Sequence, residues 1–263
     1  MNFAGGQEGE AGGIWPRAEP ARQMRLAAAS LVLLILGAAA FPVDLTVKSI
    51  FDKKVPEKTA SVERDSLPTK SNWRIPGDLR GFLNLCEVFA HGLGVAMIGL
   101  AVIAIDPASR RWVPRILLCA YLGGILAVSI KLLVARTRPE YFAGGETFAD
   151  TFIRWLPGFS SPTKEQSFPS GHAATAAALA AALAWRYPQG TWFFALLAML
   201  AGMQRLAEGA HYLSDVLIGG GIGLAFAAIW LPDGWLSRGL SPLESLWKNA
   251  DPAPPAEPET SGR

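Results

Sequence analysis

Two of the chain's three histidines have neighbours that could make them reactive. His211 and Asp215 are four residues apart, a spacing that places two side chains on one face of a helix. A carboxylate in that position can accept the imidazole N–H, fix the tautomer and make the other ring nitrogen more basic. His172 follows Ser170 and Gly171 at the head of a run of alanine and leucine. The two histidines could therefore serve as a nucleophile and as a general acid or base.

Three cations, Lys131, Arg138 and Arg205, stand near the ends of apolar runs. Cations in such places are costly unless something negative compensates them, so we expect an anion between them. Ser170 is a good N-cap, and the N–H groups after it would project unpaired from a helix start, where the helix dipole also favours negative charge. A glycine lets the backbone approach closely, and guanidinium groups match phosphate oxygens. Phosphate is the anion that fits these donors best.

The composition indicates which solvent surrounds these residues. Of 263 residues, 51% are hydrophobic and 17% are charged, the profile of a membrane protein. Backbone groups in lipid must be paired within their own segment, so we predict an all-α, polytopic membrane bundle. Six transmembrane helices of about 20 residues each are expected, at roughly 26–43, 81–105, 112–134, 169–187, 191–207 and 211–231.

The polar residues gather at four ends of these predicted spans. They are Lys131 and Arg138 near the exit of the third, Ser170 to His172 at the entrance of the fourth, Arg205 at the exit of the fifth, and His211 with Asp215 at the entrance of the sixth. Successive spans run in opposite directions, so these ends are expected at one membrane face, in one pocket. The pattern predicts two-step phosphoryl transfer through a phosphohistidine, with cations stabilising the transition state. No Asp/His cluster has metal-ligand spacing, so neither a metal nor another cofactor is expected.

Three segments resemble the signature motifs of the type 2 phosphatidic acid phosphatase superfamily, the integral-membrane lipid phosphate phosphatases. They are KLLVARTRP (131–139), PSGH (169–172) and RLAEGAHYLSD (205–215), and with the helices the likeness spans roughly 81–231. The resemblance implies a role for each predicted site residue. Lys131, Arg138 and Arg205 would hold the phosphate with Ser170 and Gly171, His172 would be the acid and base, His211 would become phosphorylated, and Asp215 would support it.

Two positions depart from the family pattern. Gln204 stands where the family usually has serine; an amide still donates a hydrogen bond, so we expect retuned phosphate contacts and retained activity. Leu213 replaces a frequent proline, with no predicted consequence. The family's lipid phosphatases mostly open toward the extracytoplasmic side.

The amino-terminal sequence agrees with that orientation. Arg17, Arg22 and Arg25 precede the first apolar run, which predicts a cytoplasmic tail over 1–25 and an outside position for 44–80, although this segment carries eight Lys and Arg residues. The same arginines, before a run that ends GAAAF, are also typical of a cleaved secretory signal, an alternative left open. We expect an integral protein of a bacterial inner membrane, with its site facing the periplasm.

The remaining boundaries follow from composition. The phosphatase domain is predicted over 26–231, with a motif-bearing core over 81–231. A Pro- and Glu-rich tail over 232–263 is predicted to be disordered.

Four further polar residues stand near the predicted site. Glu87 and His91, also four apart, could line the substrate entrance or satisfy each other as an intramembrane pair. Arg136 and Glu140 flank the first motif, and a solvated surface role is expected for both.

Other residues carry structural predictions only. Small residues should permit close helix packing, at glycines 219, 220, 221 and 223 and the alanines of 173–184. Tryptophans at the ends of the apolar runs should lie at the headgroup level, namely Trp112, Trp185, Trp192 and Trp230. Cys86 and Cys119 are expected to be free and packed as small apolar residues.

The sequence does not indicate which lipid carries the phosphate. Phosphatidic acid, phosphatidylglycerophosphate, undecaprenyl pyrophosphate and lipid A phosphates all present the same terminal group, and segments 44–80 and 140–168 are the expected selectors. Two alternatives remain: a lipid phosphotransferase, in which another lipid replaces water, and a non-catalytic transport or sensor bundle that only binds phosphate. The expected partners are the lipid substrate and the membrane, with no nucleic acid; the oligomeric state is open.

Overall fold

The structure, a computed structural model, describes residues 20–51, 76–142 and 144–232, together with residues 239 and 242. The rest of the chain, including most of both predicted tails and much of the predicted segment 44–80, lies outside the described residues.

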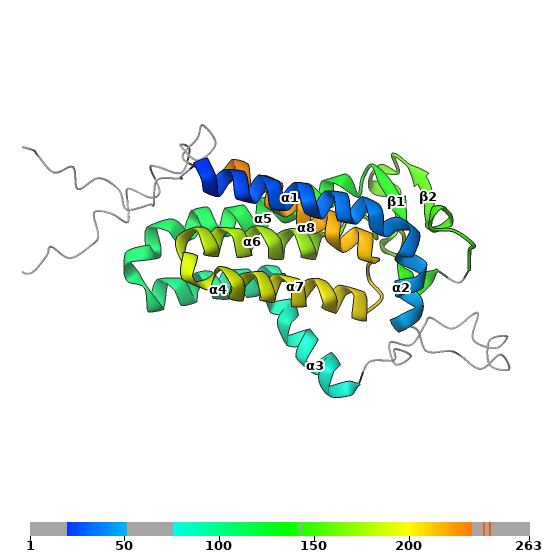
Figure 1. The fold of residues 1–263 in the computed structure, drawn as a ribbon, viewed down its shortest axis with the longest axis horizontal. Helices are drawn as coiled ribbons and strands as arrows, with labels where there is room; N and C mark the ends of the chain where they lie inside the picture. Colours follow the sequence, from blue (N-terminus) through cyan, green and yellow to red (C-terminus); the bar gives the residue numbers. More distant parts are fainter. Residues whose placement is uncertain (1–19, 52–75, 143, 233–238, 240–241, 243–263) are drawn as a thin grey trace, which may run out of the picture.

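Helices account for most of the described chain, as predicted, and the long ones run alongside one another (Figure 1). They are α1 (Pro20–Ala40), α2 (Asp44–Phe51), α3 (Gly77–Cys86), α4 (Gly92–Ile105), α5 (Val113–Ile130), α6 (Gly171–Arg186), α7 (Thr191–Ala207) and α8 (Leu213–Trp230).

A small antiparallel hairpin between α5 and α6 was not predicted. Its strands are β1 (Val134–Arg136) and β2 (Phe152–Trp155). The register shifts between Ala135 and Arg136, and all three residues of β1 are buried. The hairpin therefore carries part of the first motif into the protein.

The alanine-rich helix α6 lies in the middle of the bundle, packed against α5, α7 and α8. Most of its residues are buried alanines, which favour a helix and let neighbouring helices approach closely. On α8, a side-chain carbon built on Gly223 would lie 2.2 Å from the carbonyl oxygen of Ala174, and one on Gly219 would lie 2.3 Å from that of Ser170. The packing predicted for these glycines and alanines is confirmed.

Helix α1 covers the other face of α8. The hydroxyl of Ser30 donates to the carbonyl oxygen of Gly221 at 2.8 Å, and Leu33 and Leu34 lie over Gly220 and Gly221. Removal of α1 as a cleaved leader would uncover this face of α8.

The number of full spans differs from the prediction. Among the described residues, three segments are long and apolar enough to cross a membrane, Pro20–Phe51, Pro107–Ile130 and Leu213–Trp230, and a fourth is added if the pair Gly77–Phe89 and Gly92–Ile105, bent by 68°, counts as one. The expected six are not confirmed. With 16 and 17 residues, α6 and α7 reach only about 24–26 Å, against a hydrocarbon thickness of about 30 Å. Because other helices enclose α6, its length need not match the lipid.

The outer surface of the bundle is apolar, as expected for helices in lipid. Large exposed hydrophobic side chains lie on α1, α4, α5 and α7, among them Leu31, Ile35, Leu93, Leu100, Ile125, Phe193 and Met199. Apolar surface of this extent is typical of a membrane-facing bundle.

Three of the four tryptophans predicted at the headgroup level are enclosed by the bundle. Trp112, Trp185 and Trp230 are buried in the core, and the ring of Trp230 donates to the carbonyl oxygen of Arg115 at 3.1 Å. Only Trp192, which is 87% exposed, is placed to meet headgroups among these four. The free, buried state predicted for Cys86 and Cys119 is confirmed.

We expect Gly223→Ala to destabilise the protein, because its new carbon would meet the backbone of Ala174 at 2.2 Å and α6 and α8 would have to separate. The cost should be about 1–3 kcal/mol, as for other overpacked cores. Gly220→Ala is the matched control, since its carbon would meet only the end of Leu33 at 3.4 Å. Thermal unfolding in detergent measures both; equal stability of the two variants would contradict the packing described here.

Candidate active site

The four predicted helix ends meet at one end of the bundle. They surround a cavity of about 430 Å³. Six of the predicted site residues line it: Lys131, Arg138, Gly171, His172, Arg205 and His211. Folding thus brings together residues up to 80 positions apart in the sequence, counted from 131 to 211.

The other two predicted site residues lie beneath the cavity and do not line it. Ser170 is fully buried, and its hydroxyl accepts from the N–H of Ala173 at 3.3 Å, so it caps α6 as expected. Its own N–H donates to the carbonyl oxygen of Asp215 at 3.0 Å. The two motifs are therefore tied together by the backbone under the cavity floor.

The cations leave hydrogen-bond donors unused. Lys131 donates to the carbonyl oxygen of Gln166 at 2.8 Å. The Nε atoms of Arg138 and Arg205 are buried, and neither has a hydrogen-bond partner within the part of the chain that the structure describes. Buried donors without partners are rare in proteins. The cavity is therefore suited to an anion that accepts several hydrogen bonds.

His211 is held differently from the prediction. It precedes α8, so it does not share a helix face with Asp215. Its Nδ1 lies 2.6 Å from the carbonyl oxygen of Ser167 and 3.8 Å from Oδ2 of Asp215. A carbonyl oxygen only accepts, so Nδ1 carries the proton and Nε2 is the basic nitrogen. We expected the carboxylate of Asp215 to fix the tautomer of His211. The backbone carbonyl of Ser167, which is closer, mainly fixes it instead.

Burial shifts the ionisation of several site residues, among them Lys131 and His211. It lowers the pKa of Lys131 to about 8, helped by the charge of Arg138 and opposed by Asp215. Burial also lowers the pKa of His211 to about 3, again with Asp215 opposing. At neutral pH the lysine is therefore mostly charged, and the histidine is neutral with a free lone pair.

Asp215 acts through other groups. Its Oδ2 accepts from the hydroxyl of Ser167 at 2.6 Å and from the N–H of Tyr212 at 2.9 Å. Its Oδ1 lies 2.5 Å from a terminal nitrogen of Arg136. The carboxylate therefore holds both segments that flank His211.

The expectation for Arg136 was wrong. Its side chain is fully buried and forms ion pairs with Asp44 at 2.7 Å and with Asp215 at 2.5 Å. We expected the side chain of Arg136 to be solvated, as it would be in a loop. Arg136 lies instead in β1, whose three residues are all buried. Glu140 is half-buried.

Glu87 belongs to the site. The predicted second span breaks between α3 and α4, and Glu87 lies at this break. Its Oε1 is 2.9 Å from a terminal nitrogen of Arg205 and 3.6 Å from Nε2 of His172. His91 lines the cavity. Of the two alternatives for these residues, the structure thus favours a place beside the cavity.

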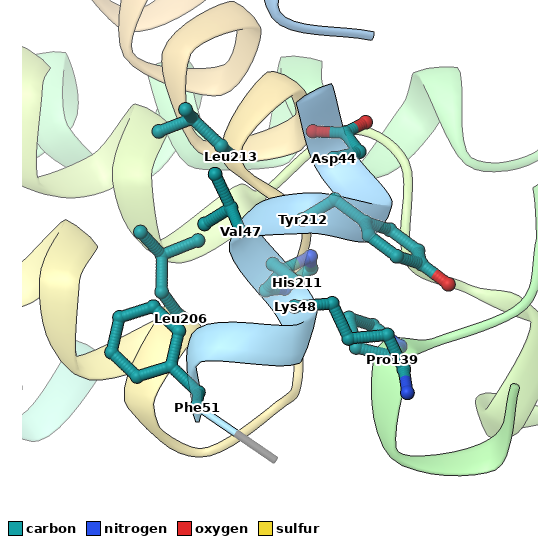
Figure 2. A pocket seen from close by; sticks show the side chains of 9 residues that line it. All are labelled: Asp44, Val47, Lys48, Phe51, Pro139, Leu206, His211, Tyr212 and Leu213. Atoms are coloured by element: carbon teal, nitrogen blue, oxygen red, sulfur yellow. The ribbon is translucent and has the colours of Figure 1, made fainter. Parts of the chain in front are cut away.

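Gln204 does not line the cavity. It is fully buried, and its carbonyl oxygen accepts from Arg205 at 3.1 Å. Its amide nitrogen lies 3.4 Å from both Asn84 and Glu87. It therefore orients Arg205 from below. Leu213, the other departure, begins α8 and faces α2 in a separate small pocket (Figure 2).

Among the described residues, no group of three or more His, Cys, Asp or Glu side chains could hold a metal ion. The ring nitrogens, ammonium and guanidinium groups around the cavity are placed to act on a phosphate directly. An apolar helical bundle with such a cavity at one end is suited to bind a phosphate at the surface of a membrane.

The chain belongs to the PAP2 superfamily, whose family model matches residues 112–237. It is 35% identical over 134 residues to a lipid A 1-phosphatase of Rhizobium etli, covering 46% of this chain and 55% of that protein. A lipid A 1-phosphatase of Rhizobium johnstonii is 35% identical over 126 residues, or 43% and 49% of the two chains. The chain thus matches about half the length of these two relatives.

A third relative is covered more fully. The decaprenylphosphoryl-5-phosphoribose phosphatase of Mycolicibacterium smegmatis is 32% identical over 144 residues, 55% of this chain and 72% of that protein. No solved structure matches the chain significantly. All three relatives are named as phosphatases of lipids, which agrees with the family.

Activity on a lipid phosphate should fall above about pH 8, the pKa of Lys131. The ammonium is present below this pKa and is lost above it, so kcat/KM, which reports the free enzyme, should decline there. A bound phosphate favours the charged lysine, so kcat should hold to higher pH. In Lys131→Arg the cation cannot be lost, and the alkaline decline of kcat/KM should disappear. An unchanged decline in this variant would assign it to another group.

Proposed function

We propose that this protein hydrolyses the terminal phosphate of a lipid phosphate or lipid pyrophosphate through a phosphohistidine at His211. One observation carries the proposal: His172 and His211 line the same cationic cavity, and the bond from Nδ1 to the Ser167 carbonyl leaves Nε2 of His211 free to attack.

In the proposed first step, Nε2 of His211 attacks phosphorus and the bond to the lipid oxygen breaks. His172 protonates that oxygen, so the lipid leaves as a neutral alcohol, or as a monophosphate if the substrate is a pyrophosphate. In the second step His172 takes a proton from water as its oxygen attacks phosphorus. The P–N bond then breaks, and inorganic phosphate leaves.

The charges of the cavity support such a reaction. Lys131, Arg138 and Arg205 would surround the equatorial oxygens, with the N–H of Gly171 at the start of α6. Donors fixed in advance stabilise the charge of the transition state without reorganisation. No step requires a metal ion.

The walls of the cavity support a lipid as substrate. Ile125 and Val128 of α5 line it, and both are more than half exposed on the outside of the bundle. An acyl or prenyl chain could thus lie against α5 in the bilayer while its phosphate reaches the cations. The names of the relatives, two lipid A 1-phosphatases and a decaprenylphosphoryl-5-phosphoribose phosphatase, favour lipids of this kind.

We propose that the site faces the periplasm across a bacterial inner membrane. Arginines gather at the end of the bundle opposite the cavity, near the start of α1 and the turns α4–α5 and α6–α7 (Figure 1): Arg22, Arg25, Arg110, Arg111 and Arg186. The positive-inside rule favours a cytoplasmic position for that end.

Phosphate release from a panel of lipid phosphates would define the substrate. The panel would contain dioctanoyl phosphatidic acid, phosphatidylglycerophosphate, undecaprenyl pyrophosphate and lipid A, each in detergent micelles with purified protein. Analysis of the products with an added acceptor lipid separates hydrolysis from phosphotransfer. Release from none of these lipids would contradict the proposed function.

We expect His211→Ala to abolish phosphate release, because no nucleophile remains. His172→Ala should slow release by about 10²–10⁴-fold, the usual contribution of a general acid or base. Rapid quenching with labelled substrate should trap acid-labile phosphate on the wild type and not on His211→Ala, and EDTA should leave the wild type active.

His91→Ala is the matched control, since it removes the third histidine and should still form the phosphoenzyme. A binding-only transport or sensor bundle predicts no covalent phosphate at all. Label on another residue, or loss of activity in EDTA, would contradict the mechanism.

Glu87→Gln should strengthen inhibition by inorganic phosphate. The Glu87 carboxylate lies against Arg205 and His172, where a phosphate must bind, so its charge competes with the ligand. Screening at this partly exposed position limits the expected fall in Ki to about three- to fivefold. Glu208→Gln is the control, because Glu208 contacts Arg205 at 3.5 Å but, unlike Glu87, has no ion pair with His172 among the described residues. An unchanged Ki for Glu87→Gln would remove Glu87 from the phosphate site.

A further inference from the structure

Arg136 is a fully enclosed charge near the site. Its side chain is fully buried and makes four hydrogen bonds. Nε donates to Thr151 at 2.9 Å, one terminal nitrogen donates to Ser214 at 2.8 Å and Asp215 at 2.5 Å, and the other donates to Asp44 at 2.7 Å. Two carboxylates from distant parts of the chain thus share one guanidinium.

Aromatic rings close the space around this guanidinium. Its central carbon lies 4.1 Å from the ring centre of Tyr212, 4.7 Å from that of Phe152 and 5.3 Å from that of Phe41. Rings at these distances favour a cation and exclude water from its faces. Arg136 is therefore held in one place from every side.

Asp44 comes from a part of the chain that the family match does not include. The match begins at residue 112, whereas Asp44 is the first residue of α2. Helix α2 lies across the segment that carries His211 and Tyr212 (Figure 2). Asp44 also accepts from the backbone N–H of Ser214 at 3.0 Å and from its hydroxyl at 2.5 Å. It therefore fixes the first turn of α8, which contains Asp215.

A continuous set of contacts joins this cluster to the free nitrogen of His211. Arg136 holds one oxygen of Asp215, and the other oxygen accepts from the Ser167 hydroxyl at 2.6 Å. The carbonyl of the same serine accepts from Nδ1 of His211 at 2.6 Å. The direction of Nε2 thus depends on where Ser167 lies, and Ser167 depends on Asp215.

We propose that Asp44 and Arg136 are positioning residues for phosphoryl transfer, which rests on the proposed function. They hold Asp215 and, through Ser167, direct Nε2 of His211 at the phosphorus atom. Helix α2, which begins at Asp44, then helps to position the proposed nucleophile, although it lies outside the family match and far from the three motifs in sequence.

The geometry requires an arginine between the two carboxylates. A guanidinium presents donors in a rigid fork and can bond two carboxylates at once, whereas an ammonium is a single point of charge. The cluster carries two negative charges and one positive, so its net charge is minus one. Loss of Arg136 alone would leave Asp44 and Asp215 buried together without a cation, which is strongly unfavourable.

Three variants of the full chain in detergent test the proposal. Asp44→Asn keeps the shape of the side chain and one acceptor, and Arg136→Lys keeps the positive charge without the fork. The double variant Asp44→Asn, Arg136→Gln leaves only the charge of Asp215, so the net charge of the cluster stays at minus one. This double variant should therefore unfold at a temperature nearer to that of the wild type than Arg136→Gln alone.

With dioctanoyl phosphatidic acid as substrate, kcat should fall about 10–100-fold in each variant, as for other residues that orient a reacting group from behind. The rate of phosphohistidine formation after rapid mixing should fall equally. KM and the Ki of inorganic phosphate should change by less than about twofold, because the phosphate ligands are untouched. A merely structural role would not separate kcat from KM in this way.

Arg154→Gln is the matched control. Arg154 lies on β2, opposite Ala135, and Ala135 is the residue before Arg136. The guanidinium of Arg154 pairs with Glu165 at 2.9 Å on the protein surface. Arg154→Gln makes the same chemical change as Arg136→Gln in the same hairpin. It should leave kcat and KM unchanged.

Several results would overturn the inference. They are a folded variant that keeps kcat within threefold of the wild type, a parallel change in KM and in the Ki of phosphate, or the failure of all three variants to fold. A wild type without activity on lipid phosphates would contradict the proposed function instead. A wild type that needs His211 but tolerates all three variants would contradict only this inference.

Discussion

The end of the bundle that carries the cavity is governed by one constraint: a charge at the boundary of the membrane must have a partner inside the protein. Arg136 is enclosed by two carboxylates, and Arg205 pairs with Glu87. Among the described residues, the one hydrogen bond of the Lys131 ammonium goes to a backbone carbonyl oxygen, and Nε of Arg138 has no partner. Carboxylates of the protein thus pair with some of its cations. The other cations face the cavity, where a phosphate would pair with them.

The positions of the cavity residues could be predicted because their signals are local. The length of an apolar run fixes where a helix ends, and Ser170 before an alanine run predicts a helix start with free N–H groups. The alternation of helix directions then places such ends on one face. Lys131, Arg205 and His211 were located together on this basis, and the structure brings them to one cavity. Their chemical roles remain proposals.

The supporting layer could not be predicted because its signals are distant. Arg136 depends on Asp44, 92 residues earlier, and on Asp215, 79 residues later. A three-residue strand has too short a pattern to distinguish it from a loop, so a buried arginine looked like a solvated one. The break at Glu87 was missed for a similar reason, since an uninterrupted apolar run reads as one helix. The six expected spans are not confirmed, and α6 shows why an apolar run is an ambiguous signal: its buried residues are enclosed by other helices of the protein.

The two histidines differ in the way that the proposed reaction requires. A nucleophile must point in one direction, and His211 is 2% exposed, with its ring fixed by a carbonyl oxygen that Asp215 and Arg136 hold in place. A group that passes protons to the leaving oxygen and takes them from water must reach both, and His172, which also lines the cavity, is 35% exposed. The rigid layer behind His211 and the open position of His172 therefore have separate origins. The first needs the long-range cluster, including helix α2, whereas the second needs only the start of α6, which is why a short motif is enough to specify it.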